Sequence, residues 1–309
     1  MCADVSDTRR PRFFLHRSFM GEQDLLTIFN TRRCRYHCYF CQLPVRCSEK
    51  WISGDDILYQ FEYVLNELKH SLSVIERMTF SNDGSILDEE TMPTETLVTM
   101  VKCVNEVRRV RKLVLETRLE FVIPQTVQLL EKVAPRAKVN ILTGFETLDP
   151  HIREEILGKK ETIAEFEVGL DRVAEADAAL TAFVLYKPSQ KMTDPEAYLE
   201  ASRSIEYLKS ECGERQIDLT IRLNPMYAAK GSVWASVARH TPTYRPSRLS
   251  DIIELAKREA GKGTGVYIGL STEELEDEWG TYRDREDFSR ELLKQAILFN
   301  TTRRIASSV

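Results

Sequence analysis

The stretch that decides the fold of this chain is Thr31-Arg32-Arg33-Cys34-Arg35-Tyr36-His37-Cys38-Tyr39-Phe40-Cys41-Gln42-Leu43. It holds three of the seven cysteines of the 309-residue sequence, spaced as C-x3-C-x2-C. Seven cysteines placed at random over such a chain would give this triplet well under about 1% of the time. Two thiolates three or four residues apart can turn toward a common centre, and a third can cap it. The spacing therefore predicts a soft, sulfur-lined site for Zn²⁺ or an iron–sulfur cluster.

The number of thiolates favours the cluster over the zinc ion. A structural zinc ion takes four ligands, usually from two separated C-x2-C pairs, and the sequence holds no second pair. Three thiolates on a four-iron cluster leave one iron open, where a small molecule can bind and receive an electron. A three-ligand zinc site and a set of buried thiols without metal remain as alternatives.

The stretch resembles the signature of the radical S-adenosylmethionine (SAM) superfamily, including the aromatic Phe40 just before the last cysteine. The resemblance implies that Cys34, Cys38 and Cys41 hold a [4Fe–4S] cluster. It further implies that the amino and carboxylate groups of SAM chelate the open iron and that Phe40 lies beside the adenine. An electron from the cluster would then cleave a carbon–sulfur bond of SAM to give a carbon radical, with flavodoxin or ferredoxin as the kind of electron donor expected.

Composition describes an ordinary soluble globular protein, with 42% apolar and 29% charged residues. The sequence has no run of about 18 apolar residues and its N-terminus has no apolar core for a secretory signal, so we expect neither a membrane span nor export. The sequence has an odd number of cysteines, and three of them lie close together at positions 34, 38 and 41, which is not typical of a disulfide framework. These features predict a cytoplasmic protein.

The net charge of −5 favours a small-molecule substrate over a nucleic acid. Proteins that hold long nucleic acids usually present a basic face, because neutralising phosphates supplies most of their non-specific affinity. The local basic stretches are Arg32-Arg33 with Arg35, and residues 108–112. We expect both to be solvated surface or helix ends and not an RNA-binding track.

Short apolar strands alternate with amphipathic helices over most of the chain. Strands are expected at residues 24–30, 77–80, 112–117, 138–144, 179–186 and 216–223. Helices are expected at 53–68, 93–107, from 124, from 149, at 162–174 and at 195–208. This alternation predicts parallel βαβ units, which fit a doubly wound sheet or an incomplete barrel. The resemblance decides between them and implies an α/β fold with a partial (β/α)6 TIM-type barrel.

The rhythm of strands and helices changes after Leu223. Glycine and proline punctuate the chain as far as Pro246, and a helix at 248–260, a strand at 265–270 and a helix at 284–299 follow. The sequence therefore predicts an N-terminal segment (1–23), the barrel (24–225) and a C-terminal helical and mixed extension packed on the barrel (226–309).

Polar residues at the strand ends are the candidates for cofactor binding, because chemistry in parallel α/β folds lies beyond the carboxyl ends of the strands. By the resemblance, Asn82-Asp83-Gly84 takes the place of the glycine-rich turn that contacts the SAM amino group, although the usual Gly-Gly-Glu is missing. Glu116 is expected to accept bonds from ribose hydroxyls, and Arg118 to pair with the SAM carboxylate. Glu146 ends the fourth strand in a comparable place. The alternatives are an ordinary polar turn and ion pairs at the barrel mouth.

The strand-end motifs look most like one branch of the superfamily, which includes the radical SAM subunit of archaeosine synthase and, further off, the Elongator catalytic subunit. The similarity spans most of residues 25–250 and rests on residues 82–85, 116–118, 144–147 and 224–226. The chain has neither an acetyltransferase domain nor a basic RNA-binding extension, which speaks against a tRNA substrate. A tRNA-modifying enzyme is kept as the second alternative.

Three further residues are expected to line the substrate end of the cavity, and a fourth cysteine is expected to reach it. The three are Lys187, Arg222 and Asn224, and the cysteine is Cys47, whose alternative is an ordinary loop thiol. A soft ligand beside the cluster suits a thiophilic substrate. The first alternative function is therefore transfer of the 3-amino-3-carboxypropyl group of SAM to arsenite with formation of a C–As bond, as in the radical SAM enzyme of arsinothricin biosynthesis. No residue is assigned as a catalytic acid or base.

Overall fold

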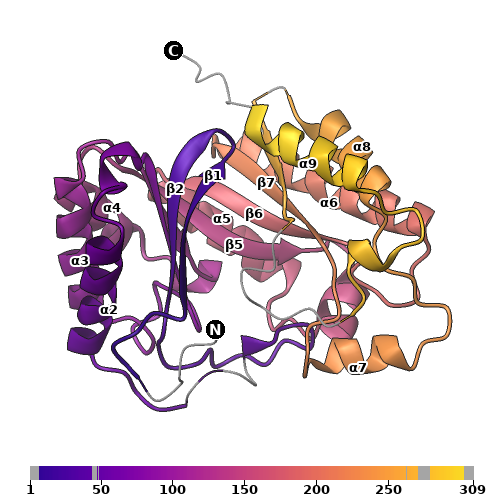
Figure 1. Cartoon of the computed structure of the whole chain (residues 1–309), viewed down its shortest axis with the longest axis horizontal. Helices are drawn as coiled ribbons and strands as arrows, with labels where there is room; N and C mark the ends of the chain where they lie inside the picture. Colours follow the sequence, from indigo (N-terminus) through magenta and orange to yellow (C-terminus); the bar gives the residue numbers. More distant parts are fainter. Residues whose placement is uncertain (1–6, 44–46, 48, 262, 271–278, 303–309) are drawn as a thin grey trace. The chain divides into compact units, whose positions relative to one another are not determined.

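The computed structural model describes residues 7–43, 47, 49–261, 263–270 and 279–302. Its strands form one eight-stranded sheet in the order β1-β2-β3-β4-β5-β6-β7-β8 (Figure 1). The strands are β1 (Phe13–Phe19), β2 (Glu22–Phe29), β3 (Arg77–Asn82), β4 (Lys112–Glu116), β5 (Lys138–Glu146), β6 (Ala179–Tyr186), β7 (Leu219–Pro225) and β8 (Gly265–Ile268).

The strand order distinguishes a barrel from a doubly wound sheet. A doubly wound sheet reverses its order at a switch point, whereas here each strand pairs with the next one along the chain. Strand β2 pairs in parallel with β3, β3 with β4, β4 with β5 and β7 with β8. Strands β2 to β7 are the six predicted strands, so the predicted partial (β/α)6 barrel is confirmed.

Helices follow the strands, as the apolar periodicity predicts. They are α2 (Gly54–Glu67), α3 (Thr94–Glu106), α4 (Pro124–Val133), α5 (Ile163–Glu175), α6 (Asp194–Glu214), α7 (Val233–Arg239), α8 (Leu249–Glu259) and α9 (Arg290–Thr302). Short helical turns lie at η1 (Leu72–Val74), η2 (Leu119–Phe121), η3 (Ile152–Ile156, a π-helix) and η4 (Tyr282–Asp284). Side-chain caps fix two of the starts: Ser53 accepts from the Asp56 N–H at α2, and Thr193 forms a capping box with Glu196 at α6.

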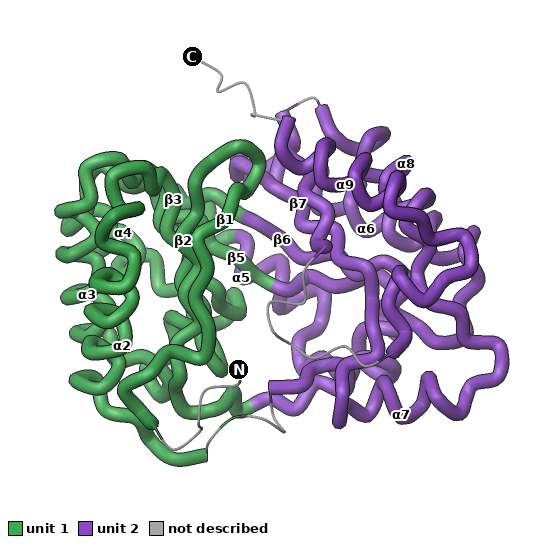
Figure 2. The backbone as a smooth tube through the Cα atoms, in the orientation of Figure 1, with its two compact units in different colours: residues 1–35, 46–143, 171–180 green, residues 36–45, 144–170, 181–309 purple. Residues whose placement is uncertain are grey.

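The chain divides into two compact units (Figure 2). Unit 1 comprises residues 1–35, 46–143 and 171–180, and unit 2 comprises residues 36–45, 144–170 and 181–309. The division between them falls inside the cysteine stretch, just before residue 46, and inside β5, α5 and β6. The predicted division into 1–23, 24–225 and 226–309 stays a prediction.

Unit 1 begins with a strand that the sequence did not predict. Strand β1 lies in the predicted N-terminal segment and pairs antiparallel with β2, with Phe13 opposite Ile28. The chain reverses at Met20 and Gly21, whose φ values of 52° and 84° match the mirror-image turns of tight hairpins. Helices α2, α3 and α4 stack along one side of this part of the sheet (Figure 1). Phe29, Phe61 and Phe80 pack edge to face between them.

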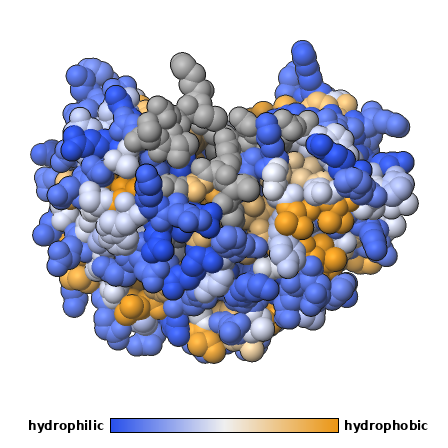
Figure 3. All heavy atoms as spheres, turned by 90° about the horizontal axis from the view of Figure 1, so that it is seen from below, coloured by the Kyte–Doolittle hydropathy of each residue, from blue (hydrophilic) through white to orange (hydrophobic). Residues whose placement is uncertain are grey.

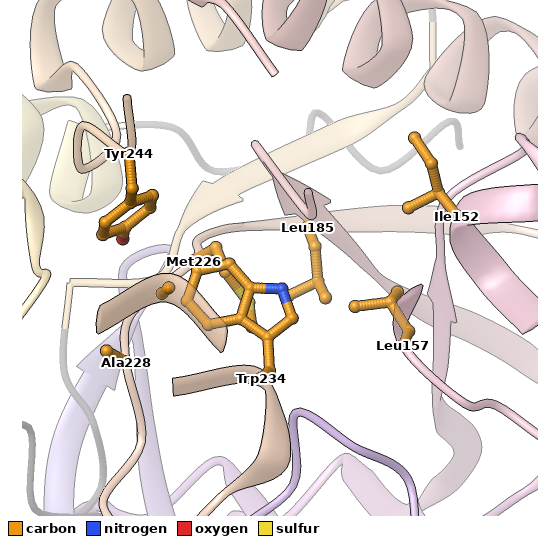
Figure 4. Packing of buried hydrophobic residues seen from close by; sticks show 8 residues of the cluster. Ile152, Leu157, Leu185, Met226, Ala228, Trp234 and Tyr244 are labelled. Atoms are coloured by element: carbon orange, nitrogen blue, oxygen red, sulfur yellow. The ribbon is translucent and has the colours of Figure 1, made fainter. Parts of the chain in front are cut away.

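Unit 2 has an apolar cluster centred on Trp234, which is fully buried (Figure 4). The other members are Ile152, Leu157, Leu185, Met226, Ala228, Ala238 and Tyr244. The Trp234 indole N–H donates to the Pro188 carbonyl at 2.8 Å, so the one polar atom of the ring has a partner. Phe40 of the cysteine stretch packs against this cluster.

No helix in the described part of the chain is long and apolar enough to cross a membrane. On the face drawn in Figure 3, hydrophilic residues predominate and apolar residues gather in small groups between them.

Candidate functional site

The cysteine motif is shared between the two units. Cys34 belongs to unit 1, and Cys38 and Cys41 belong to unit 2. All three side chains are half-buried. Within the described ranges, no three His, Cys, Asp or Glu side chains form a group that would hold a single metal ion. Three soft sulfur donors on one loop suit an iron–sulfur cluster by their chemistry, and their assignment as its ligands stays a prediction.

In unit 1, the loop that leads to Cys34 is attached to the end of β3 through Asp83. The Cys34 N–H donates to the Asp83 main-chain carbonyl at 2.7 Å, and the Thr31 N–H donates to Asp83 Oδ2 at 3.3 Å. The Asp83 carboxylate is fully buried, and Arg12 Nε donates to its two oxygens at 3.1 and 2.9 Å. Burial raises the pKa of Asp83, while the charge of Arg12 and a hydrogen bond from the Cys47 thiol oppose that rise. Sequence reasoning did not identify Arg12 as a residue of this site.

The turn predicted to contact the SAM amino group has a fixed local structure. Asn82 Oδ1 accepts from the Gly84 N–H at 2.9 Å, and Asn82 Nδ2 donates to Thr91 Oγ1 at 3.2 Å. A Cβ on residue 84 would lie 2.8 Å from Thr91 Cγ2, so glycine is needed for this packing. The turn is therefore held in place by its own side chains and by Thr91.

The end of β4 lies against the residues that follow this turn. The Glu116 carbonyl accepts from the Ile86 N–H at 2.9 Å, and the Arg118 N–H donates to Ser85 Oγ at 3.2 Å. Both Glu116 and Arg118 are half-buried, and the Arg118 guanidinium lies 3.4 Å from a Glu120 carboxylate oxygen. The structure thus brings the predicted residues 82–84, 116 and 118 together at neighbouring strand ends of unit 1.

In unit 2, Tyr39 attaches the segment that carries Cys38 and Cys41. Its N–H donates to the Leu157 carbonyl at 2.7 Å, and its carbonyl accepts from the Trp234 N–H at 2.9 Å. Gly158 has a φ of 61°, and a Cβ there would lie 2.8 Å from the Tyr39 ring. The segment therefore rests on the end of η3 and on the start of α7.

Glu146, at the end of β5, is surrounded by buried charges. It is 7% exposed, has a φ of 73°, and lies 3.9 Å from Lys159 Nζ. The fully buried Arg153 donates to the carbonyls of Phe145 and Thr147 on either side of it. A positive φ at a non-glycine residue costs free energy and persists where the surroundings enforce it, often at a functional site. The predicted role of Glu146 in cofactor binding stays a prediction.

The three predicted substrate residues also lie in unit 2. Lys187 is buried, has a φ of 64°, and donates to Asp194 Oδ1 at 2.6 Å. The buried Arg222 guanidinium lies 4.9 Å from the Phe183 ring centre and 5.8 Å from that of Tyr267. Asn224 Oδ1 is a buried acceptor for which the described residues supply no donor. An acceptor of this kind is a place where a ligand N–H or O–H can bind.

No protein-family model matches the sequence. Two subunits named archaeosine synthase subunit beta are similar to it. The one from Methanosarcina acetivorans is 24% identical over 238 residues, covering 76% of this chain and 66% of that protein. The one from Thermococcus kodakarensis is 25% identical over 158 residues, covering 49% of this chain and 46% of that protein. This chain therefore spans about two thirds and just under half of their lengths.

Solved structures share the fold at low sequence identity. Spore photoproduct lyase, solved with bound AdoMet and a dinucleoside spore photoproduct, has a TM-score of 0.55 at 14% identity, covering 83% of this chain and 79% of that one. Methylornithine synthase has a TM-score of 0.54 at 13% identity, covering 92% and 83%. SuiB of Streptococcus suis, bound to S-adenosylmethionine, has a TM-score of 0.54 at 15% identity, covering 82% and 52%.

The fold, the C-x3-C-x2-C stretch after β2 and the relatives agree with one another, and they support the predicted resemblance of this chain to the radical SAM superfamily.

Proposed function

We propose that this protein is a radical SAM enzyme that holds a [4Fe–4S] cluster on Cys34, Cys38 and Cys41. The observation that supports the proposal most is the cysteine stretch itself, attached at Cys34 to the end of β3 and at Tyr39 to the end of η3. When bound, the cluster supplies the electron that cleaves a carbon–sulfur bond of SAM. Since such a cluster is sensitive to oxygen, we place the protein in the reducing cytoplasm, with a flavodoxin or ferredoxin as electron donor.

We assign the contacts of SAM to Phe40 and to polar residues at strand ends, unit by unit. In unit 1, we assign the turn at residues 82–84 to the amino group, Glu116 to the ribose hydroxyls and Arg118 to the carboxylate. In unit 2, we assign Phe40 to the adenine face and Glu146 to a further polar contact. SuiB and spore photoproduct lyase, which share the fold, were solved with this cofactor bound.

We propose a small-molecule substrate, held by Lys187, Arg222 and Asn224. The net charge is −5, and acidic partners compensate the basic residues of the cysteine stretch. Arg32 lies 3.6 Å from Glu90, and Arg35 lies 2.7 Å from Asp88. Arginines that are already ion-paired contribute little to a phosphate-binding surface, because nucleic acid must displace their partners first.

Iron and acid-labile sulfide in anaerobically purified protein test the cluster. We expect about four of each per chain, as for a [4Fe–4S] cluster, and loss of both in Cys34→Ala, Cys38→Ala and Cys41→Ala. Cys103→Ala is the matched control, because Cys103 is an exposed residue of α3 outside the motif. Zinc without sulfide, or equal loading of a motif variant and the control, would contradict the proposal.

Two other reactions each have one supporting observation. The relatives named archaeosine synthase subunit beta support a tRNA substrate. The Cys47 thiol, hydrogen-bonded to Asp83 at the base of the Cys34 loop, supports a thiophilic substrate and hence transfer of the 3-amino-3-carboxypropyl group of SAM to arsenite.

The nucleoside formed from SAM by the reduced protein separates two of these reactions. 5′-Deoxyadenosine indicates the adenosyl radical that we propose, and 5′-methylthioadenosine indicates aminocarboxypropyl transfer. A tRNA-binding titration at two salt concentrations tests the third reaction. Affinity that falls steeply with salt would support tRNA, because phosphate contacts release counterions.

A further inference from the structure

Arg12 lies just before β1, and its side chain reaches the base of the cysteine loop, which follows β2. Its N–H donates to the Ile28 carbonyl at 2.8 Å, which fixes its backbone beside β2 just before β1 begins. Its side chain meets Asp83, 71 residues away in the sequence, through Nε at 2.9 and 3.1 Å and Nη2 at 2.9 Å. The Arg12 side chain is 19% exposed and that of Asp83 is 0% exposed, so this ion pair is largely shielded from water.

Asp83 in turn contacts the loop at two points on the path to the first motif cysteine. Its Oδ2 accepts from the Thr31 N–H at 3.3 Å, and its main-chain carbonyl accepts from the Cys34 N–H at 2.7 Å. The Cys47 thiol, beyond the motif, also bonds to the Asp83 carboxylate. One buried residue therefore holds the segment before the motif, the first motif cysteine and the segment after the motif.

The hydrogen-bond donors around Asp83 account for the hydrogen bonds that its carboxylate can accept. An ionised carboxylate offers about four lone-pair sites, and here Arg12, Thr31 and Cys47 direct donors at them. The ammonium group of SAM would need one of these sites. A buried carboxylate without its counterion is strongly destabilised, so Arg12 and Asp83 depend on each other.

We propose that Arg12 and Asp83 are positioning residues for Cys34: their ion pair fixes the backbone at the end of β3, to which the loop that follows β2 is attached, and the Asp83 carboxylate does not bind the SAM ammonium group. This inference rests on the proposed function, because it concerns a ligand of the proposed cluster.

Three variants test the proposal in the full chain: Arg12→Gln, Asp83→Asn and the double variant. Each single variant leaves one buried charge without its partner, and we expect iron and sulfide uptake per folded chain to fall by about tenfold, the effect of a change near 1.4 kcal/mol. The double variant removes both charges and keeps the main-chain bond to Cys34. We expect it to recover most of the uptake.

Arg17→Gln is the matched control. Arg17 pairs with the fully buried Asp24 at 2.9 Å in the same hairpin, at the opposite end of β2. This variant loses one arginine partner of a buried aspartate, although Asp24 keeps Arg77 at 3.7 Å, and thermal unfolding of the metal-free proteins measures the loss of stability in each case. Equal loss of iron uptake in Arg17→Gln and Arg12→Gln would overturn the proposal, because the pair would then be merely structural. Unchanged uptake in Arg12→Gln would also overturn it.

SAM binding to the double variant that has taken up iron and sulfide tests the statement that the Asp83 carboxylate does not bind the SAM ammonium group. We expect the dissociation constant from equilibrium dialysis, and the change that SAM causes in the EPR signal of the reduced protein, to match the wild type within about twofold, less than 0.5 kcal/mol. Normal loading with SAM affinity weaker by tenfold or more would identify Asp83 as the ammonium ligand and refute this statement. If the wild-type chain takes up no iron and sulfide, the proposed function fails; if only these variants behave otherwise than expected, this inference alone fails.

Discussion

Replacing Gly158 by alanine should weaken the attachment of the Cys38–Cys41 segment. Residue 158 has a φ of 61°, a conformation that costs an L-residue about 1–2 kcal/mol. The new Cβ would lie 2.8 Å from the Tyr39 ring, well inside the 3.4 Å at which ordinary contact begins, so the ring must move. The main-chain bonds of Tyr39 to Leu157 and Trp234 contribute about 0.5–1.5 kcal/mol each and weaken as it moves. We expect unfolding to become easier by about 2–4 kcal/mol.

Urea unfolding of the metal-free protein measures the loss of stability, and iron and sulfide content after anaerobic reconstitution measures its effect on the motif. Gly213→Ala is the control, because Gly213 lies within α6 and a Cβ there meets nothing within 4 Å. That change should be neutral or stabilising, by up to about 1 kcal/mol. Tyr39→Ala in the Gly158→Ala background should restore the part of the loss that comes from the ring contact. Equal stability and equal iron content in Gly158→Ala and Gly213→Ala would refute the reasoning.

Two further predictions concern buried ion pairs. Asp24→Asn removes the partner of Arg17 and Arg77 at the amino end of β2, where a fully buried carboxylate is paired, and should cost about 3–5 kcal/mol in urea unfolding without lowering iron uptake per folded chain. Burial raises the pKa of Asp194, but the hydrogen bond and charge of Lys187, together with the charges of Arg285 and Arg248, outweigh it and hold the pKa below that of an ordinary aspartate. The stability that Asp194 contributes is therefore complete above about pH 4 and is lost as the pH falls further. Unfolding free energies of wild type and Asp194→Asn should differ by a constant amount above pH 4 and converge below it, and a constant difference down to pH 2 would contradict this assignment.

The sequence predicted the barrel well because its signals are local. Each parallel strand is a short apolar run and each helix has an apolar face, and both patterns depend on residues next to one another in the chain. Strand β1 lacks this signal. It is an edge strand of mostly half-buried residues, and His16, Arg17 and Ser18 interrupt its apolar residues, so it contains no continuous apolar run. Its pairing is set by the turn at Met20-Gly21 and by the facing strand β2.

Residues of the candidate site could be predicted only where their spacing along the sequence indicates a known kind of chemistry. The C-x3-C-x2-C spacing predicts three ligands within one loop, whereas the Arg12–Asp83 pair joins residues 71 apart and depends on the unpredicted strand. For the same reason the sequence predicts Asp83 as a cofactor-binding residue without showing its partner Arg12, and that role of Asp83 stays a prediction. The bonds of Tyr39 to Leu157 and Trp234 likewise join segments that no spacing rule connects.

Backbone strain helps to distinguish two interpretations of the polar residues at the strand ends, ligand binding and ion pairing, which the sequence left open. Among the described residues, five that are not glycine have a positive φ: Met20, Glu146, Asp177, Lys187 and Gln216. Met20 lies in the β1–β2 turn, and Asp177 and Gln216 come just after α5 and α6, where a left-handed residue commonly ends a helix. Glu146 is the central residue of a tight three-residue turn, in which the Thr147 N–H donates to the Phe145 carbonyl at 3.1 Å, and this type of turn is rare and strained. Lys187 follows β6 directly and ends no helix.

These two residues instead occupy the carboxyl ends of the consecutive strands β5 and β6, and both are buried ionisable side chains. An ion pair at the barrel mouth would need no unfavourable backbone, because an ordinary strand end can present a carboxylate or an ammonium group equally well. The strain costs about 1–3 kcal/mol at each residue. It is therefore better explained if the direction of each side chain matters to a ligand, which favours binding roles for Glu146 and Lys187 over purely structural ones.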